Sequence, residues 1–219
     1  MRVSAEGHQP PVPGSELSVE TIHLAAGEPL ECGADDEDTI VFLCTPEDGV
    51  THLVLAGERT NVTNAGDATS ALRASIRSGA DRHAPMGRRE QIVVPSQVDA
   101  EGATGNRSFE VLFGPHNGST RATLFVGHVP PGAAPWHFHL YDEIVWIWCG
   151  EGRFHTRDGC EPLAPGSAFR IRPREVHIVE NTSASDELVV VGLFTPAGSP
   201  SAAYLADEED VPYVLEAAS

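Results

Sequence analysis

The sequence contains no lysine, because all 14 of its basic residues are arginine, and these face 32 aspartates and glutamates. A Schiff base needs a primary amine, so this absence excludes enzymes that bind a carbonyl substrate or pyridoxal phosphate through lysine. The formal net charge of −18 repels nucleic-acid phosphates and anionic lipid surfaces. We therefore expect neither nucleic acid nor a membrane among the partners of this protein.

Long apolar runs and paired cysteines are missing as well. No run approaches the roughly 18 apolar residues that a membrane-spanning helix needs, and the N-terminal MRVSAEGHQPPVPGSEL has no apolar stretch typical of a signal peptide. The four cysteines form no CxxC pair, which excludes zinc-finger and thioredoxin-like motifs. We expect a cytoplasmic protein whose cysteines are small, buried apolar side chains.

Amphipathic helical patterns are equally scarce. The chain instead consists of short β-like runs of about 5–8 residues, separated by turns rich in Gly, Pro, Asn and Asp. Helical turns are expected only in DATSALRASI (67–76) and in the acidic tail AYLADEEDVPYVLEAA (203–218). Short strands at this spacing predict an all-β sandwich or barrel with few helices.

Shifts in composition divide the chain into five parts. The N-terminal stretch is rich in proline, glycine and polar residues, and SQVDAEGATGNR is polar and contains glycine. The predicted organisation is a disordered or extended arm (1–16), a first β domain (17–95), a linker or loop (96–107), a second β domain (108–200) and an acidic C-terminal segment (201–219).

The two predicted β domains resemble each other faintly. Two pairs of segments carry the likeness: TIVFLC (39–44) with IVWIWC (144–149), and LAGERTNVTNAGD (55–67) with RPREVHIVENTSA (172–184), which aligns Thr60 with His177 and Asn64 with Asn181. An internal duplication would produce this likeness. Two unrelated β segments of ordinary composition would produce it too, and the sequence alone does not decide between them.

The stretch WHFHLYDE (136–143) carries the strongest chemical signal. Side chains two apart on a β-strand point the same way, so His137, His139 and Glu143 share one face if the strand is continuous. Burying two imidazoles and a carboxylate is unfavourable unless a charged group satisfies them, and a metal ion does so. This segment therefore predicts three metal ligands.

A second stretch, PGSAFRIRPREVHIVEN (165–181), holds a further candidate ligand, His177. Together the two stretches resemble the paired sequence motifs of the cupin family over about residues 109–195. The matching positions are Gly132, His137, His139, Glu143 and Gly150 in the first motif, and Gly166, Pro173, His177 and Asn181 in the second. Gly132 lies one residue closer to His137 than is usual, Pro173 falls one residue late, and Arg174 replaces the usual inner glycine. None of these departures touches a ligand position.

The resemblance implies a jelly-roll β-barrel with a metal near its centre. The ligands carried over are His137, His139, Glu143 and His177. Three neutral imidazoles and one carboxylate suit Fe(II), our first choice, and also Zn(II), Ni(II), Mn(II) or Co(II). In octahedral geometry four protein ligands leave two positions open, which is typical of a catalytic rather than a structural site.

By the same resemblance, the first β domain is a degenerate cupin and the whole chain a bicupin. At the equivalent places it offers Cys32, Asp38 and Thr60 in place of a His/His/Glu/His set, so we predict no metal there. The alternative is a single cupin that carries an N-terminal β extension.

The alternation of side chains along a strand divides the residues near the predicted ligands into two groups. The aromatic side chains out of phase with them are Trp136, Phe138, Trp146 and Trp148. We predict that these form an apolar outer face covered by the N-terminal half or by a second subunit in a homodimer; a bulge would instead turn them into a substrate cage. The opposite phase places Val145, Ile147 and Cys149 inside, as the wall of a pocket for a mostly apolar or aromatic molecule.

Four other side chains are weaker candidates for the pocket. Tyr141 shares the phase of the ligands and either transfers protons or faces solvent in a turn. Arg170 and Arg172 give their strand a basic face, which either pairs with surplus acids or binds a substrate carboxylate. His155 lies one strand away and either approaches the pocket or is an ordinary hydrogen-bonded histidine.

The predicted function is that of a metal-dependent enzyme acting on a small organic molecule. An Fe(II)-dependent oxygenase or dioxygenase is the first reaction class. A redox-neutral cyclase, isomerase or decarboxylase is the second, with the polyketide cyclases of the cupin family as the comparison. A non-enzymatic small-molecule binder is the third, and the complete ligand set argues against a purely structural role.

Overall fold

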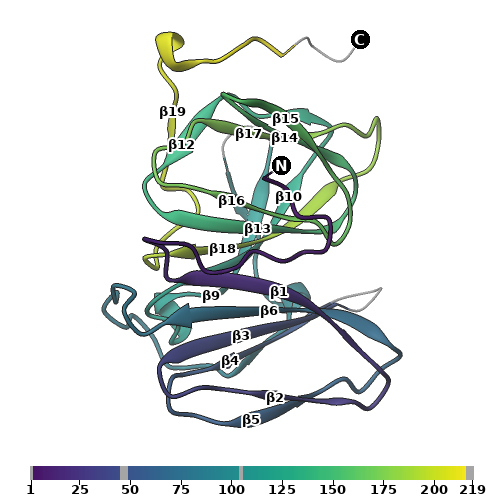
Figure 1. Cartoon of the computed structure of the whole chain (residues 1–219), viewed down its shortest axis with the longest axis vertical. Coiled ribbons are helices and arrows are strands. Elements are labelled where there is room, and N and C mark those ends of the chain that lie inside the picture. The colour runs from purple at the N-terminus through teal and green to yellow at the C-terminus, as the bar shows by residue number, and fades with distance from the viewer. Residues whose placement is uncertain (1, 45–48, 104–105, 216–219) are drawn as a thin grey trace.

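The computed structural model describes residues 2–44, 49–103 and 106–215. Two β domains are stacked along the long axis, with the N-terminal domain below the C-terminal one in Figure 1. The described residues contain no α-helix, only the short 3₁₀ helices η1 (Pro95–Gln97), η2 (Pro115–Asn117) and η3 (Glu208–Asp210). The prediction of an all-β fold with few helices is confirmed. None of the helices in the described part of the chain is long or apolar enough to span a lipid bilayer.

The first domain consists of a sheet in the order β1-β6-β3-β4-β7 and a separate hairpin, β2-β5. The strands are β1 (Leu17–Leu24), β2 (Pro29–Cys32), β3 (Glu37–Cys44), β4 (Gly49–Val54), β5 (Thr60–Thr63), β6 (Thr69–Arg77) and β7 (Ile92–Val93). The helical turns predicted at 67–76 are wrong, because β6 occupies this stretch and buries Leu72, Ala74 and Ile76 at every second position. The opposing faces of the sheet and hairpin enclose a small core around Val41 and Val62.

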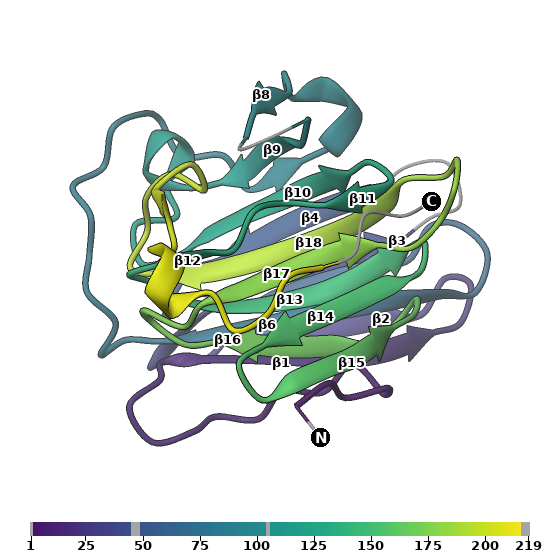
Figure 2. The same ribbon diagram turned by 90° about the horizontal axis from the view of Figure 1, so that it is seen from above.

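The second domain is a barrel of two sheets, in the orders β16-β13-β18-β10-β9-β8 and β15-β14-β17-β12-β19 (Figure 2). Its strands are β8 (Glu101–Gly102), β9 (Ser108–Phe113), β10 (Thr123–Val129), β11 (Gly132–Ala133), β12 (His137–His139), β13 (Asp142–Cys149), β14 (Gly152–Thr156), β15 (Gly159–Leu163), β16 (Ala168–Ile171), β17 (His177–Asn181), β18 (Leu188–Thr195) and β19 (Ala203–Leu205). Apolar side chains from both sheets, including Phe154 and Phe169, form the core of the barrel.

The two domains share one apolar core. Leu17, Phe42 and Ile76 of the first domain belong to the same buried cluster as Leu124, Trp146 and other residues of the second. The ring of Trp148 packs edge-on against Phe42 with the centroids 4.9 Å apart. The outer face that carries Trp146 and Trp148 is thus covered by the N-terminal half of the same chain. The homodimer remains a prediction, but its interface would not be formed by Trp146 and Trp148.

The strand registers of the two domains correspond at the ligand positions. Cys32 pairs with Thr60 across β2 and β5, as His137 pairs with His177 across β12 and β17. This places Cys32 at the position of His137 and Thr60 at that of His177.

The aligned asparagines make the same contacts in both domains. Each side-chain amide donates to two backbone carbonyls: those of Ala25 and Asp67 for Asn64, and those of Val129 and Asp186 for Asn181. Each side-chain oxygen accepts the backbone N–H two residues later, from Gly66 and from Ser183, respectively. Matching registers and matching side-chain bonds favour the internal duplication over a chance likeness.

Asp38 occupies in β3 the place that Glu143 occupies in β13, but its carboxylate is used differently. Both Asp38 oxygens lie 2.8 Å from Nη1 of Arg121, and Oδ1 also accepts the backbone N–H of Ala56 at 2.9 Å. Arg121 comes from the second domain, just before β10. The first domain therefore satisfies its buried carboxylate with an arginine.

The ends of the second domain lie outside the predicted limits. β8 falls within the linker predicted at 96–107 and pairs with β9, and β19 falls within the predicted C-terminal segment and pairs with β12. The described part of the N-terminal arm consists of turns and isolated bridges, with Ser4 bridged to Ala168 and the Arg2 N–H bonded to Glu161 at 2.7 Å. Segments that composition marks as polar are thus integrated into the barrel.

The cysteines divide into two groups. Cys32 and Cys44 are buried, and burial raises the pKa of the Cys44 thiol to about 12. Cys149 and Cys160 are exposed, so the expectation that all four are buried is wrong for this pair.

Candidate functional site

The two predicted motifs meet inside the second barrel. β12 carries His137 and His139, β17 begins with His177 directly opposite His137, and Glu143 lies near the start of β13. The ring centroids of His137 and His177 are 4.4 Å apart, and those of His139 and His177 are 5.1 Å apart. All four side chains are buried, with His139 and His177 only 2% exposed. The structure thus brings together every residue predicted to bind a metal.

The backbone fixes the same tautomer in all three histidines. The Nδ1 atoms of His137, His139 and His177 lie 2.8–2.9 Å from the carbonyl oxygens of Pro135, Tyr141 and Glu175, respectively. A carbonyl only accepts, so each Nδ1 must carry the proton and donate it. In the neutral form each Nε2 is then left with a lone pair, which is the state in which imidazole binds a metal.

The contact between His139 and Glu143 is unfavourable unless a cation lies between them. Nε2 of His139 lies 2.8 Å from Oε2 of Glu143, yet it has no hydrogen-bond partner of acceptable geometry although it is buried. Two electron-pair donors at this distance repel each other unless a proton or a metal ion neutralises them. The donor set, an unsatisfied buried nitrogen and a carboxylate, fits a borderline divalent metal.

The four side chains converge without forming a finished coordination sphere. In the described part of the chain, no group of three or more His, Cys, Asp or Glu side chains has its atoms placed as a metal centre requires. Metal binding would therefore need the side chains to close in around the ion.

The turn before β17 keeps its shape although it lacks the usual glycine. Arg174 has φ = 65°, the left-handed conformation that glycine adopts most easily. Its N–H donates to the carbonyl of His139 at 2.7 Å, which ties the turn to the ligand strand. A local strain of about 1 kcal/mol is offset by this bond across the site.

A cavity of about 100 Å³ lies beside the four side chains. Its apolar walls come from both sheets: Phe109, Phe125, Val129, Val145, Ile171, Val179 and Val190. Of the three predicted wall residues, Val145 lines the cavity, and Ile147 is buried in the barrel core away from it. Cys149 is exposed, because the pairing of β13 with β18 shifts register between Ile147 and Cys149 and reverses the phase of the strand.

Tyr141 lines the cavity and packs against a predicted ligand. Its ring stacks on that of His139 at 4.0 Å and on that of Phe194 at 4.0 Å, and its hydroxyl donates to the Pro200 carbonyl at 3.3 Å. Burial raises the pKa of the phenol, and Glu143 raises it further. The contacts describe a neutral side chain that holds the His139 ring in place.

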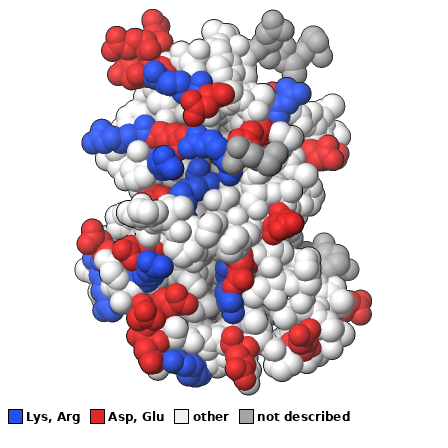
Figure 3. All heavy atoms as spheres, viewed as in Figure 1, with Lys and Arg blue, Asp and Glu red and all other residues white. Residues whose placement is uncertain are grey.

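Arg170 and Arg172 do not reach the cavity. Ile171 faces the cavity, so its neighbours in the strand point away from it. Arg170 is buried, with its guanidinium 2.7 Å from the Asp142 carboxylate, and it donates to the backbone carbonyls of Pro10 in the N-terminal arm and Leu17 in β1. Arg172 is exposed, on a domain whose visible face carries several arginines beside acidic residues (Figure 3). The predicted role of this pair in binding substrate is wrong, whereas the alternative of pairing with acids holds for Arg170.

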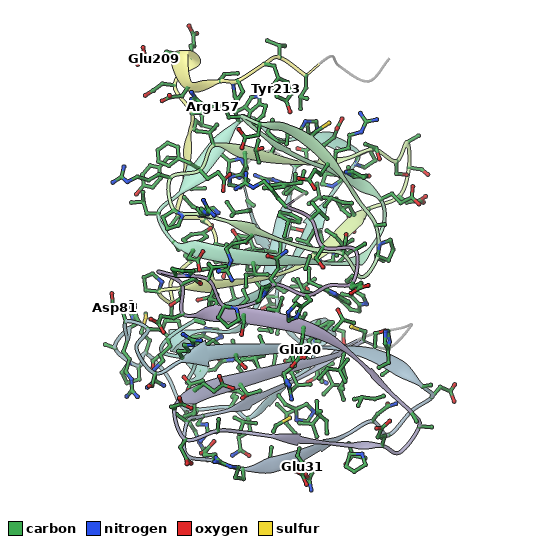
Figure 4. All side chains as sticks on the ribbon, in the orientation of Figure 1. Glu20, Glu31, Asp81, Arg157, Glu209 and Tyr213 are labelled. Atoms are coloured by element: carbon green, nitrogen blue, oxygen red, sulfur yellow. The ribbon has the colours of Figure 1, made fainter. Side chains whose placement is uncertain are left out.

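His155 belongs to the outer side of the barrel. Its Nε2 lies 2.8 Å from Oε2 of Glu180, and its Nδ1 lies 2.8 Å from the hydroxyl of Tyr213. Tyr213 also packs against Trp136 at 5.0 Å, above the second barrel in Figure 4. His155 therefore fixes the C-terminal segment over β12, and its predicted place in the substrate pocket is wrong. The segment covers Phe138 as well, since Tyr204 stacks on it at 5.4 Å.

Two residues of the site have no motif signal. Arg107, at the end of the predicted linker, lines the cavity near Glu143. Gly192 of β18 lies beneath the site, where an added Cβ would be 2.2 Å from Phe125 Cε1 and 2.9 Å from Glu143 Oε1. The period of the strand that begins at Ser108 could have placed Arg107 on the inner face, two residues before Phe109.

We expect Gly192→Ala to displace Phe125 and the Glu143 carboxylate. Overpacking at such a contact lowers the free energy of unfolding by about 1–3 kcal/mol, and the displaced carboxylate should weaken metal binding as well. Urea unfolding and a metal titration measure the two effects. Gly198→Ala is the matched control, because its Cβ would lie 4.0 Å from the nearest heavy atom. Equal behaviour of the two variants would contradict this account of the site.

The metal-free protein should lose stability in acid. Burial lowers the pKa of His137 to about 4, with Arg107 adding to the shift, and burial also holds the pKa of His177 well below its usual value. Between pH 6.5 and 4 the unfolded chain therefore binds protons that the folded chain does not. The free energy of unfolding should fall with falling pH in this window, by about 1 kcal/mol per pH unit for each such histidine. Urea unfolding at several pH values tests this, and His137→Asn should flatten the dependence.

The comparisons with known proteins agree with this geometry. Residues 125–194 match the family described as the cupin domain. No curated protein matches the sequence significantly. The fold is similar to that of an IolB-like protein from Salmonella typhimurium, with a TM-score of 0.67 and 12% identity over 90% of this chain and 89% of that one.

Two further solved structures share the fold. A point mutant of oxalate decarboxylase from Bacillus subtilis has a TM-score of 0.64 and 10% identity, over 88% of this chain and 71% of that one. AerE from Microcystis aeruginosa has a TM-score of 0.64 and 10% identity, over 83% of this chain and 88% of that one. Identities this low establish a common fold, and the activity has to be argued from the site.

Proposed function

We propose that this chain, whose residues 125–194 match the cupin-domain family, is a metal-dependent enzyme that converts a small organic molecule. One divalent transition metal would be held by His137, His139, Glu143 and His177. The substrate would occupy the adjoining cavity of about 100 Å³. The first domain would contribute no metal site, since Asp38 is bound to Arg121.

One observation carries the proposal. Three buried imidazoles have their Nδ1 protons committed to backbone carbonyls, and the Nε2 of one of them faces the Glu143 carboxylate at 2.8 Å. An arrangement of electron-pair donors without protons between them is unfavourable in a buried site unless a cation binds. A storage protein with a purely structural role has no need of such a set.

A bound divalent ion would polarise a substrate oxygen or, if it is iron, exchange electrons with dioxygen. The chain's own residues prepare the site for this chemistry. The backbone carbonyls orient the imidazoles, Tyr141 stacks on His139, and apolar side chains form much of the cavity wall.

Fe(II)-dependent oxygenation is our first reaction class. The walls around the site are built mainly from aliphatic and phenylalanine side chains. Such walls favour dioxygen chemistry, because they limit the escape of reactive oxygen species and the entry of water. The substrate would be small, because the cavity of about 100 Å³ is smaller than the engineered cavity of about 150 Å³ that holds benzene.

Redox-neutral chemistry, as in a decarboxylase, isomerase or cyclase, is the second candidate. Arg107 favours it, because a guanidinium beside the site would stabilise a carboxylate or an enolate. A similar fold, at 10% identity and a TM-score of 0.63, occurs in oxalate decarboxylase from Bacillus subtilis, whose structure is described with Mn(II) centres.

Anaerobic reconstitution with Fe(II) and with Mn(II), followed by substrate screening, tests the proposal. Oxygen uptake that depends on both iron and an organic substrate would support the oxygenase. Turnover without oxygen uptake would support the redox-neutral class. Ligand binding without turnover under either metal would overturn the enzymatic function and leave a small-molecule binder.

A further inference from the structure

A groove lies between the two domains, where β1 of the first domain runs beneath the second (Figure 1). Its volume is about 690 Å³, which is within the range of about 300–1,000 Å³ typical of small-molecule sites. Its walls come from β1, β6 and the end of β3, from β13, from the N-terminal arm, and from the loops before β6 and β16. None of the described residues that line this groove also lines the cavity beside the predicted metal ligands. The two spaces are therefore separate.

Trp148 gives the groove an aromatic wall. Trp146 lines the groove too, but it is only 3% exposed, and its Nε1 donates to Oγ1 of Thr21 at 3.1 Å. Trp148 is half-buried, although one side of it packs against Phe42. A half-buried indole inside a groove leaves part of its ring surface available to a bound molecule.

The groove carries negative charge that no neighbouring cation balances. Glu6 and Asp67 both line it, and neither carboxylate forms an ion pair with another described residue. Arginine is absent from the described lining of the groove, and the chain has no lysine. Its remaining ionisable groups are the buried Cys44 thiol and His23, whose Nδ1 lies 3.1 Å from Oγ of Ser70. The net charge of −18 adds to the attraction that this groove exerts on a cation.

The backbone holds both carboxylate-bearing segments in place. Ser4 and Gln9, on either side of Glu6, form isolated bridges to β16 and β1, respectively. The side-chain amide of Asn64 donates to the backbone carbonyl of Asp67 at 2.6 Å. The groove is thus largely formed before any molecule binds, which reduces the entropy that binding costs.

We propose that this groove is a second binding site, for a small organic cation that consists of an ammonium group with apolar substituents. The indole of Trp148 would attract the cation and contact its methyl or methylene groups. Glu6 and Asp67 would supply the opposite charge. A neutral molecule of the same shape would lose both electrostatic contributions. The inference goes beyond the proposed function and does not depend on it, because the two sites share no described lining residue.

Calorimetric titration of the metal-free, full-length protein with choline tests the inference. The uncharged probe is the choline analogue in which a quaternary carbon atom replaces the ammonium nitrogen. We expect choline to bind with a dissociation constant of about 1 mM or tighter, and the carbon analogue to bind at least about tenfold more weakly. Equal affinity for the two probes, or no binding of choline, would overturn the proposal.

Two variants locate the binding in the groove. Glu6→Gln combined with Asp67→Asn should weaken choline binding about tenfold, and Trp148→Leu should weaken it by a similar factor. Glu31→Gln combined with Asp81→Asn is the matched control, because it removes the same charge at two exposed positions away from the groove (Figure 4).

The variants also distinguish the groove from general attraction by the charge of the protein. An equal loss of affinity in the control would show that net charge alone attracts choline, and would overturn the site. Unchanged affinity in Trp148→Leu, with a circular dichroism spectrum like that of the wild type, would overturn the role of the indole. A protein that binds no metal would still be expected to bind choline, so failure of the proposed function leaves this test intact.

Discussion

His177→Ala is expected to weaken divalent-metal binding by more than about 100-fold. Substitutions of residues that only support a metal ligand already reduce affinity by about 10- to 100-fold, and His177 would be a ligand itself. Its ring lies between those of His137 and His139, at centroid distances of 4.4 and 5.1 Å. Removing it leaves two imidazoles and Glu143, a set that holds borderline metals less firmly. Competition titration against a chelator measures the change.

Folding has to be checked in the same variant, because His177 is buried and bonded to Glu175. The circular dichroism spectrum of the metal-free variant should match that of the metal-free wild type. His83→Ala is the control, since His83 is an exposed histidine of the segment that joins β6 to β7. Unchanged affinity in a folded His177→Ala variant would remove this residue from the ligand set.

Asp38→Ala should lower the free energy of unfolding by about 3–5 kcal/mol. The substitution leaves the Arg121 guanidinium buried without its carboxylate, and an uncompensated buried charge is strongly destabilising. Both partners are nearly inaccessible, with side-chain exposures of 3% for Asp38 and 6% for Arg121. Because Arg121 belongs to the second domain, the loss should reduce the stability of both domains together. Urea unfolding followed by tryptophan fluorescence measures it.

Two further variants define the origin of the effect. Asp35→Ala breaks an exposed pair with Arg59 and should change stability by less than about 1 kcal/mol. The double variant Asp38→Leu with Arg121→Met removes both charges and should recover much of the loss. A loss of stability in Asp38→Ala no larger than in Asp35→Ala would show that the buried pair does not couple the domains.

Local patterns in the sequence predicted the all-β fold and three of the candidate ligands, and the resemblance to the cupin motifs completed the set with His177. His137, His139 and Glu143 lie close together along the chain, so the period of a strand alone relates them. His177 follows from the spacing of a second motif. The weak likeness of the two halves has a structural basis, visible in the matched bonds of Asn64 and Asn181. A short aligned stretch could not establish this, because the bonds that match are made only in the folded chain.

Features that depend on long-range packing could not be predicted from the sequence. The phase of β13 holds from Glu143 to Val145 but reverses at a register shift before Cys149, which turned a predicted wall residue outward. Arg107 lies in a polar stretch that composition assigned to a linker. Arg170 and His155 each also bond a residue near one end of the chain, Ser15 and Tyr213, respectively. No local pattern predicts such contacts.

The most direct test of the central claim is the metal content of the protein purified without oxygen, combined with X-ray absorption at the edge of any metal found. We predict close to one divalent transition metal per chain, with a first shell of nitrogen and oxygen atoms and with scattering from imidazole ring atoms beyond that shell. No metal after reconstitution, or a sulfur-containing shell, would contradict a site built from His137, His139, Glu143 and His177.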